Sequence, residues 1–303
     1  MMNKGVAILL FLFVGFSTKA QVDIQLNTYA QNPYYITPAY INDVQSVVFT
    51  FSGRNQWAGL NGAPQTYFGS VSSFWEDINT QIGIRIFNDK TGYISVTDAS
   101  LTYAYNLRLS DGWWSNLGLA LAYQSLDYDL SKITFEGEDE AAIYDRLTSK
   151  KKFNGDVGVE IYNPNWRFGL AGKNLTSLFS SKTPIHQNIN YLYGLYKQTS
   201  QNPISFGGGV FGIQYGNRYQ VELNATAYFK LDRENELFRT SLIYRTPKEI
   251  GVVVGINIAP SLYVSYGYDY NFGISSHRLG HTHELMLVYK LDPKPVLRWD
   301  ALE

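Results

Sequence analysis

Several short stretches of the sequence carry residue types that could do chemistry, beginning with two histidines near the C-terminus. His281 and His283 are two positions apart, so an extended chain presents both imidazoles on one side, and Glu284 is adjacent. Imidazole and carboxylate groups are ligands of Zn²⁺. The only other histidines are His186 and His277, and there is no cysteine. With so few further ligands available, we predict no metal site.

A second stretch matches a nucleotide-binding pattern by its letters alone. Gly207, Gly209 and Gly212 have the spacing G-x-G-x-x-G, which binds a dinucleotide only where a helix begins at the glycines. No helical pattern follows, because the sequence continues into the strand-like Gln214-Tyr215. Glycines inside a strand instead let large groups pack close to the backbone. The sequence therefore predicts no nucleotide and no other cofactor.

Calcium binding and hydrolysis are the two remaining chemistries. An acidic cluster formed by Glu136, Glu138, Asp139 and Glu140 lacks the spaced Asx and Gly residues of a known calcium loop, so a solvated acidic surface is the favoured interpretation. Hydrolysis would need Ser, His and a carboxylate to converge. Except for His283, at the start of a predicted strand, the histidines lie in two predicted loops, and no G-x-S-x-G elbow exists. We predict that the protein is not an enzyme, and a membrane-embedded lipid hydrolase is the least favoured alternative.

The elements that carry these residues show a period of two, which is clearest in residues 219–230. One side of that stretch is Tyr219, Val221, Leu223, Ala225, Ala227 and Phe229, and the other is Gln220, Glu222, Asn224, Thr226, Tyr228 and Lys230. This alternation predicts a β-strand with one apolar and one polar face. About a dozen residues exceed the usual five or six of a soluble strand and suit a tilted strand across a membrane. We therefore expect the apolar face to contact lipid.

Fourteen strand candidates follow one another through the chain. They are residues 47–55, 65–74, 80–87, 93–107, 114–124, 153–162, 166–174, 191–197, 206–215, 219–230, 237–246, 250–258, 262–272 and 282–291. The longest gaps (56–64, 125–152, 175–187, 273–281) follow odd-numbered strands, as the extracellular loops of an outer-membrane barrel do. We predict an all-β fold, a transmembrane antiparallel up-and-down β-barrel of about 14 strands over residues 47–291. A soluble β-sandwich or an extracellular β-solenoid is the alternative.

Composition supports the same class. Aromatic residues make up 16% of the 303 residues, with 24 tyrosines, as in barrels with aromatic girdles at both membrane interfaces. Outside the first 20 residues, no apolar run approaches the length of a spanning helix. The net charge of -1 lacks the basic excess that a nucleic-acid partner would require.

The ends of the chain indicate export from the cytoplasm. A basic start at Lys4, an apolar run over residues 6–16 and a small residue at Ala20 are the parts of a secretory signal peptide, predicted at residues 1–20. Residues 21–46 read as an irregular segment that either plugs the barrel or lies at its periplasmic rim, and residues 292–303 as a periplasmic tail. We expect the protein in the outer membrane of a Gram-negative cell, in contact with membrane lipid.

The polar faces of the predicted strands carry charges of both signs. The positions expected to point inward include Arg85, Asp156, Glu160, Arg167, Glu222, Arg239, Arg245, Asp269, Glu284 and Lys290. Opposite charges on facing strands can pair across the lumen, whereas a wide porin keeps its lumen hydrated. We therefore expect a narrow or plugged interior.

One stretch, residues 54–66, is not explained by the alternation of apolar and polar residues. It carries an arginine, an indole, amides and glycines that allow close backbone approach. On physical grounds a loop packed into the barrel mouth is favoured over a partner-binding surface. The candidate partner-binding residues, taken from here and from the longest loop, are Arg54, Asn55, Gln56, Trp57, Asn61, Pro64, Glu138, Asp139 and Tyr144.

At this stretch the chain resembles the PorP/SprF family of type IX secretion system membrane proteins. The family pattern R-N-Q-W-x-G-x-x-G-A-P-x-T matches residues 54–66. Further similar pieces follow in order, and they are Asn32-Pro33 to Pro38-Ala39-Tyr40, Asn88-Asp89-Lys90-x-Gly92, and Tyr268 to Phe272 with His283-Glu284-Leu285-x-Leu287-x-Tyr289. Thr37 stands where the family has Asn, and Ile41-Asn42 replaces its Ala-Gly.

The resemblance implies a role in the outer membrane of Bacteroidetes-type bacteria. Members of the family are paired with a large secreted adhesin, which they help to cross to the surface or to stay attached there, in some species supporting gliding motility. The implied partners are the C-terminal domain of that adhesin and other type IX secretion components, contacted through the four long loops. A passive or ligand-gated outer-membrane channel is the alternative function.

Overall fold

The chain forms a closed barrel of fourteen antiparallel strands, in which each strand pairs with its neighbours in the sequence and β1 closes the circle against β14. The computed structural model describes residues 26–42, 45–129, 148–179, 185–231, 235–246, 249–272 and 280–293. The predicted signal peptide lies outside these residues. The strands are β1 (Gln45–Asn55), β2 (Gln65–Trp75), β3 (Thr80–Thr91), β4 (Ile94–Ser110), β5 (Trp113–Tyr128), β6 (Lys150–Tyr162), β7 (Trp166–Lys173), β8 (Ile189–Lys197), β9 (Ile204–Tyr215), β10 (Arg218–Lys230), β11 (Glu236–Arg245), β12 (Glu249–Ala259), β13 (Leu262–Asn271) and β14 (Thr282–Pro293).

The predicted barrel is confirmed, and several strands are longer than the alternation indicated. β3 continues to Thr91, so the expected turn at residues 88–92 begins only at Gly92. β5 runs to Tyr128 and β6 starts at Lys150, which shortens the predicted loop 125–152. Above the lipid both faces of a strand meet water. Beyond the lipid, the hydrogen-bonded pairing of strands can therefore continue through residues that show no alternation of apolar and polar side chains.

The two faces of the wall lie as the alternation predicted. In β10, Val221 and Leu223 are 40% and 38% exposed, whereas Glu222 is 0% exposed. The apolar side chains therefore face outward and the polar ones inward. Aromatic side chains on the outer surface gather near both ends of the strands, as in a membrane barrel. They include Tyr67, Tyr123, Phe153, Tyr219 and Tyr270 at one end and Trp75, Tyr105, Trp166, Tyr196 and Tyr289 at the other.

The connections divide the barrel into two unlike ends. Those that follow odd-numbered strands meet at one end, named here the loop end, and include the four longest. Those that follow even-numbered strands are short and meet at the opposite end, the turn end. Gln45 pairs with Pro293 there, so both termini of the barrel wall lie at the turn end. Bacterial outer-membrane barrels place short turns in the periplasm and long loops outside, which assigns the loop end to the cell exterior.

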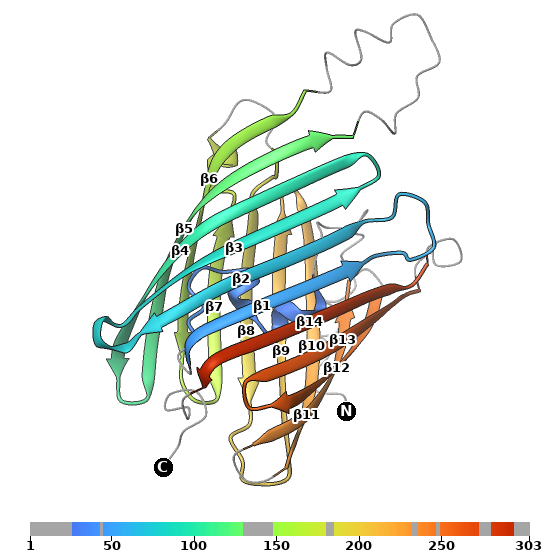
Figure 1. Cartoon of the computed structure of the whole chain (residues 1–303). Helices are drawn as coiled ribbons and strands as arrows, with labels where there is room; N and C mark the ends of the chain where they lie inside the picture. The colour runs from blue at the N-terminus through green and yellow to red at the C-terminus, as the bar shows by residue number, and fades with distance from the viewer. Residues whose placement is uncertain are drawn as a thin grey trace, which may run out of the picture.

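Residues 26–42, named here the plug, lie inside the barrel (Figure 1). They contain two 3₁₀ turns, η1 (Asn27–Ala30) and η2 (Pro33–Tyr35), and no strand. Pro33 supplies a preset backbone angle at the first position of η2, and the Asn32 side chain accepts a hydrogen bond from the N–H of Tyr34. Among the described residues, no helix is long and apolar enough to cross a membrane.

The wall makes room for the plug by lacking side chains where the two approach. A Cβ added to Gly118 on β5 would lie 2.2 Å from the nitrogen of Ala39. A Cβ on Gly158 of β6 would lie 2.1 Å from Oγ1 of Thr37. Only glycine fits at such distances, because the opposing atoms belong to the plug itself. The plug is thus fitted to this particular wall.

Candidate functional site

The inner wall toward the loop end carries a buried group of charges, named here the ion cluster. Its members are Arg54, Glu222, Arg245, Glu249, Asp269 and Glu284, contributed by six strands. Arg54 Nη1 lies 2.8 Å from Asp269 Oδ2 and 3.2 Å from Glu284 Oε2. Arg245 pairs with Glu222, and its Nη1 lies 2.6 Å from Glu249 Oε1. Four carboxylates therefore share two guanidinium groups.

The plug donates hydrogen bonds to two of these carboxylates, Asp269 and Glu284. The N–H of Asn27 donates to Glu284 Oε2 at 2.6 Å, and the N–H and hydroxyl of Thr28 donate to Oε1 at 3.0 and 2.5 Å. The Asn27 amide donates to Asp269 Oδ1 at 2.6 Å and accepts from Arg245. Buried charges are stable only when paired and hydrogen-bonded, so the first turn of the plug and the ion cluster stabilise each other.

Two more ion pairs hold the middle of the plug. Arg85 lies 2.8 Å from Asp156 across the lumen, and its Nη1 donates to the carbonyl oxygen of Tyr34 at 3.0 Å. Glu160 pairs with Arg167, whose guanidinium lies 4.8 Å from the ring centre of Tyr40. The predicted pairing of inward charges is confirmed, with one difference. Of the ten expected inward positions, Arg239 and Lys290 are half-buried and the rest are buried.

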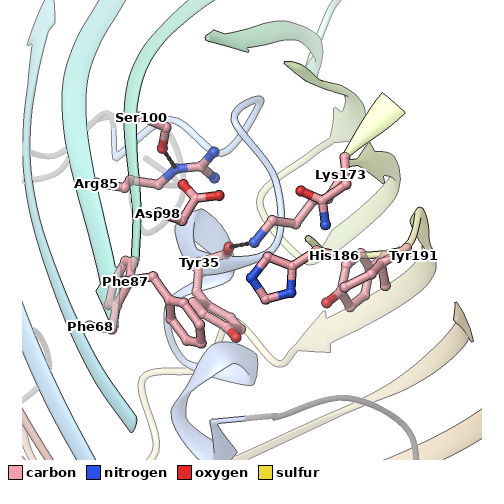
Figure 2. Close-up of a pocket in the computed structure, with 11 residues that line it drawn as sticks. Tyr35, Phe68, Arg85, Phe87, Asp98, Ser100, Lys173, His186 and Tyr191 are labelled. Atoms are coloured by element: carbon pink, nitrogen blue, oxygen red, sulfur yellow. Dashed lines mark hydrogen bonds between the residues drawn. The ribbon is translucent and has the colours of Figure 1, made fainter. Parts of the chain in front are cut away.

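A small pocket borders the plug on the side of the loop end (Figure 2). Its volume is about 30 Å³, and it is lined by Tyr35, Phe68, Arg85, Phe87, Asp98, Ser100, Lys173, Asn174, His186, Ile189 and Tyr191. Lys173 Nζ donates to the carbonyl oxygen of Tyr35 at 3.4 Å and lies 4.9 Å from its ring centre. Such a volume holds about two water molecules. The pocket is too small for a peptide or a sugar.

The proximity of Lys173, Asp98 and His186 in this pocket was not predicted from the sequence. Their positions lie in three separate parts of the chain, and alternation indicates only which face a residue occupies. Their proximity follows from the closure of the barrel.

The connection of residues 56–64 packs over the loop end. The N–H of Trp57, a residue with a φ of 56°, donates to Thr282 Oγ1 at 3.3 Å, and the N–H of Ala58 donates to the carbonyl oxygen of His281 at 2.7 Å. The N–H of Gly92 donates to the carbonyl oxygen of Gly62 at 3.0 Å. The connection therefore joins the ends of β14 and β3, as the packed-loop interpretation predicted.

Because of this packing, some of the predicted partner-binding residues are buried and others are exposed. Arg54 is 5% exposed with its guanidinium inside the ion cluster, and Gln56 and Pro64 are also buried, so the structure corrects their expected place at the surface. An arginine at an inward position finds buried carboxylates there. Trp57 is half-buried, while Asn55 and Asn61 are exposed. Glu138, Asp139 and Tyr144 lie outside the described residues.

The two histidines singled out in the sequence lie at the outer surface near the loop end. His281 Nδ1 is 2.7 Å from the hydroxyl of Tyr268, and His283 Nδ1 is 2.6 Å from that of Tyr266. Glu284 points inward to the ion cluster, away from both imidazoles. In the described part of the chain, no three His, Asp or Glu side chains form a group that could hold a metal ion.

Comparison with known proteins connects this architecture with a family. The family described as "Type IX secretion system membrane protein PorP/SprF" matches residues 18–289. No curated protein matches the chain. Among solved structures, a TodX deltaS2S3 mutant, titled a monoaromatic hydrocarbon channel, has a TM-score of 0.51 and 8% identity, covering 93% of this chain and 97% of its own. The outer membrane protein Omp33 of Acinetobacter baumannii has a TM-score of 0.48 and 6% identity, covering 82% and 100%. At these identities, the TodX mutant supports the fold alone.

Proposed function

The chain belongs to the PorP/SprF family of type IX secretion system membrane proteins and is an outer-membrane β-barrel, and from this premise we propose that it helps to export a secreted partner or to hold it at the cell surface. The partner is a large secreted adhesin, recognised through its C-terminal domain. The barrel acts as a docking structure, and neither catalysis nor free diffusion of solutes is part of its role.

The observation that carries this proposal is the filled lumen. Tyr34 and Ile36 of the plug are buried, and the plug is hydrogen-bonded to β3, β13 and β14. A passive channel needs a continuous water-filled path, as a porin has. A barrel whose interior is occupied by its own N-terminal segment instead offers a rigid wall on which the long connections are mounted.

The loop end supplies the surface for docking. Its four long connections, residues 56–64, 129–149, 174–188 and 272–281, join strands at the end assigned to the cell exterior. Loops mounted on a rigid scaffold are common binding surfaces. Asn61 within the first of them and Asn55 at the end of β1 have the exposure that contact with a partner requires.

The proposal is tested by replacing residues 130–147 with a two-residue Asn-Gly turn, which leaves β5 and β6 intact. We expect the variant to insert as a folded barrel while a tagged adhesin moves from the cell surface to the culture medium. The measurement is the cell-bound fraction of the adhesin, beside heat-modifiable mobility of the barrel on a gel as the test of folding.

The matched control shortens a connection at the turn end, residues 198–203, in the same way. This variant should retain the adhesin, because the turn end faces the periplasm. Unchanged retention after removal of residues 130–147 would contradict the role of that loop. A steady open current from the purified intact protein in a planar bilayer would contradict the docking proposal and would favour a passive channel.

A further inference from the structure

One arginine that faces the lumen is more accessible than the others. The side chain of Arg239 on β11 is 21% exposed. The arginines that contact the plug or lie in the ion cluster are 3–5% exposed, and they are Arg54, Arg85, Arg167 and Arg245. Arg239 lies close to the start of β11, which is at the turn end of the barrel. A molecule from the periplasm can therefore reach its guanidinium group.

Neighbouring side chains hold this guanidinium group in one orientation. Its Nε donates a hydrogen bond to the carboxylate of Glu236. The ring centres of Tyr228 and Tyr263 lie 5.6 and 4.6 Å from its central carbon. The two tyrosines belong to β10 and β13, which lie on opposite sides of β11 in the order of the strands. Contact with aromatic rings and with a charged partner thus fixes the planar guanidinium before a ligand arrives.

The other edge of the guanidinium group has no hydrogen-bond partner among the described residues. Glu236 is bonded through Nε, so the N–H groups on Nη1 and Nη2 of Arg239 are left unpaired. Two adjacent nitrogens of this kind can donate parallel hydrogen bonds to the two oxygens of a carboxylate. An arginine held in this way is suited to bind a planar anion.

The plug borders this part of the inner wall. The hydroxyl of Tyr263 donates to Oε1 of Gln31, the residue after η1, at 2.8 Å. Gly255 on β12 lies directly opposite Arg239 and makes room for this tyrosine, since an added Cβ would lie 1.9 Å from its hydroxyl oxygen. The first turn of the plug lies farther toward the loop end, at the ion cluster. Arg239 is therefore on the periplasmic side of the plug, and a ligand would enter from the turn end.

We propose that Arg239 is the centre of a carboxylate-binding site that faces the periplasm. Nη1 and Nη2 donate to the two carboxylate oxygens, while Glu236, Tyr228 and Tyr263 keep the guanidinium group in place. The carboxylate belongs to a small organic acid or to an acidic side chain of a peptide, which share this chemistry. The site lies at the turn end, so it is independent of the proposed docking of an adhesin at the loop end.

The experiment treats the purified full-length protein in detergent with phenylglyoxal, a reagent that modifies accessible guanidinium groups. Mass spectrometry gives the rate of modification at each arginine. We expect Arg239 to react faster than Arg54 and Arg245, because its side chain is more exposed. Acetate and the blocked peptide acetyl-Gly-Glu-Gly-amide should slow the reaction of Arg239. The peptide acetyl-Gly-Gln-Gly-amide, which lacks the carboxylate, should not.

Arg108, which is 68% exposed at the turn end, is the internal control and should react at the same rate with every probe. Protection by acetate alone would identify a small organic acid as the ligand, and protection by the Glu peptide would identify a peptide side chain. An unchanged rate at Arg239 with both probes, or protection by inorganic phosphate as strong as that by acetate, would overturn the proposal.

A matched pair of variants tests the same site by calorimetry. Arg239→Gln should weaken binding of the protecting probe about tenfold, because it removes a charge-assisted pair of hydrogen bonds. Arg108→Gln removes an exposed cation at the same end and should leave binding unchanged. Equal affinities of the two variants would contradict the role of Arg239. The protection experiment uses the unchanged protein, so it decides the proposal even where a variant does not fold.

Discussion

At the scale of single residues, Glu284 joins the wall to the plug. Its carboxylate accepts hydrogen bonds from Asn27 and Thr28 and pairs with Arg54, while being 1% exposed. In Glu284→Gln the amide keeps one acceptor oxygen and loses the charge that balances the guanidinium. Removing one partner of a buried ion pair typically costs about 3 kcal/mol or more of folding free energy. We expect a loss of that order, measured by urea unfolding of the barrel in lipid vesicles.

The matched control is Asp111→Asn at the turn end. Asp111 also pairs with an arginine, Arg108, at 2.8 Å, but both side chains are exposed. Exposed ion pairs contribute little because water screens them. The control should therefore unfold as the unchanged protein does. Equal losses in the two variants would show that burial of the ion cluster is not what makes Glu284 important.

At the scale of elements, the plug depends on glycines in the strands it crosses. In Gly118→Ala the new Cβ would lie 2.2 Å from the backbone nitrogen of Ala39. The plug is held by several hydrogen bonds, so its backbone cannot shift to relieve this clash. We expect the plug to dissociate from the inner wall of the barrel, while the hydrogen-bonded ladder of strands remains intact. Chymotrypsin should then cut at Tyr34 and Tyr35, which are buried in the unchanged protein.

Gly69→Ala is the control for this change. Gly69 also lies within a strand, β2, but an added Cβ would have nothing within 4 Å. Cleavage of its plug should stay as slow as in the unchanged protein. Protection of Tyr34 and Tyr35 in Gly118→Ala would mean that the wall moves to accommodate the plug, contrary to the fit described above.

At the scale of the whole molecule, the plug decides whether the barrel conducts. We expect the intact protein to be silent in a planar bilayer and a variant lacking residues 26–42 to give a steady current, because the polar inner wall would then face water. The fourteen-strand ladder does not include the plug, so the wall should survive its removal. A silent deletion variant would indicate that inward side chains close the lumen without the plug.

The sequence by itself determined the strands, their faces and the membrane location. Each strand shows its own alternation, as β10 does at Val221, Glu222 and Leu223, and that pattern is local. Ten charges that point into the lumen could be named from it, although Arg54 and Glu249 of the ion cluster were not among them. The ends of β3, β5 and β6 could not, since beyond the lipid no apolar face distinguishes a strand from a loop.

Only the tertiary structure decided what fills the lumen and which inward residues meet. Arg54 and Glu284 are 230 positions apart, and Asn27 and Glu284 are 257 apart. Alternation states that a side chain points inward but not what it will contact, because its partners are set by the closure of β1 on β14 and by the path of the plug. For the same reason Arg54, which the sequence offered as a contact for another protein, belongs to the interior.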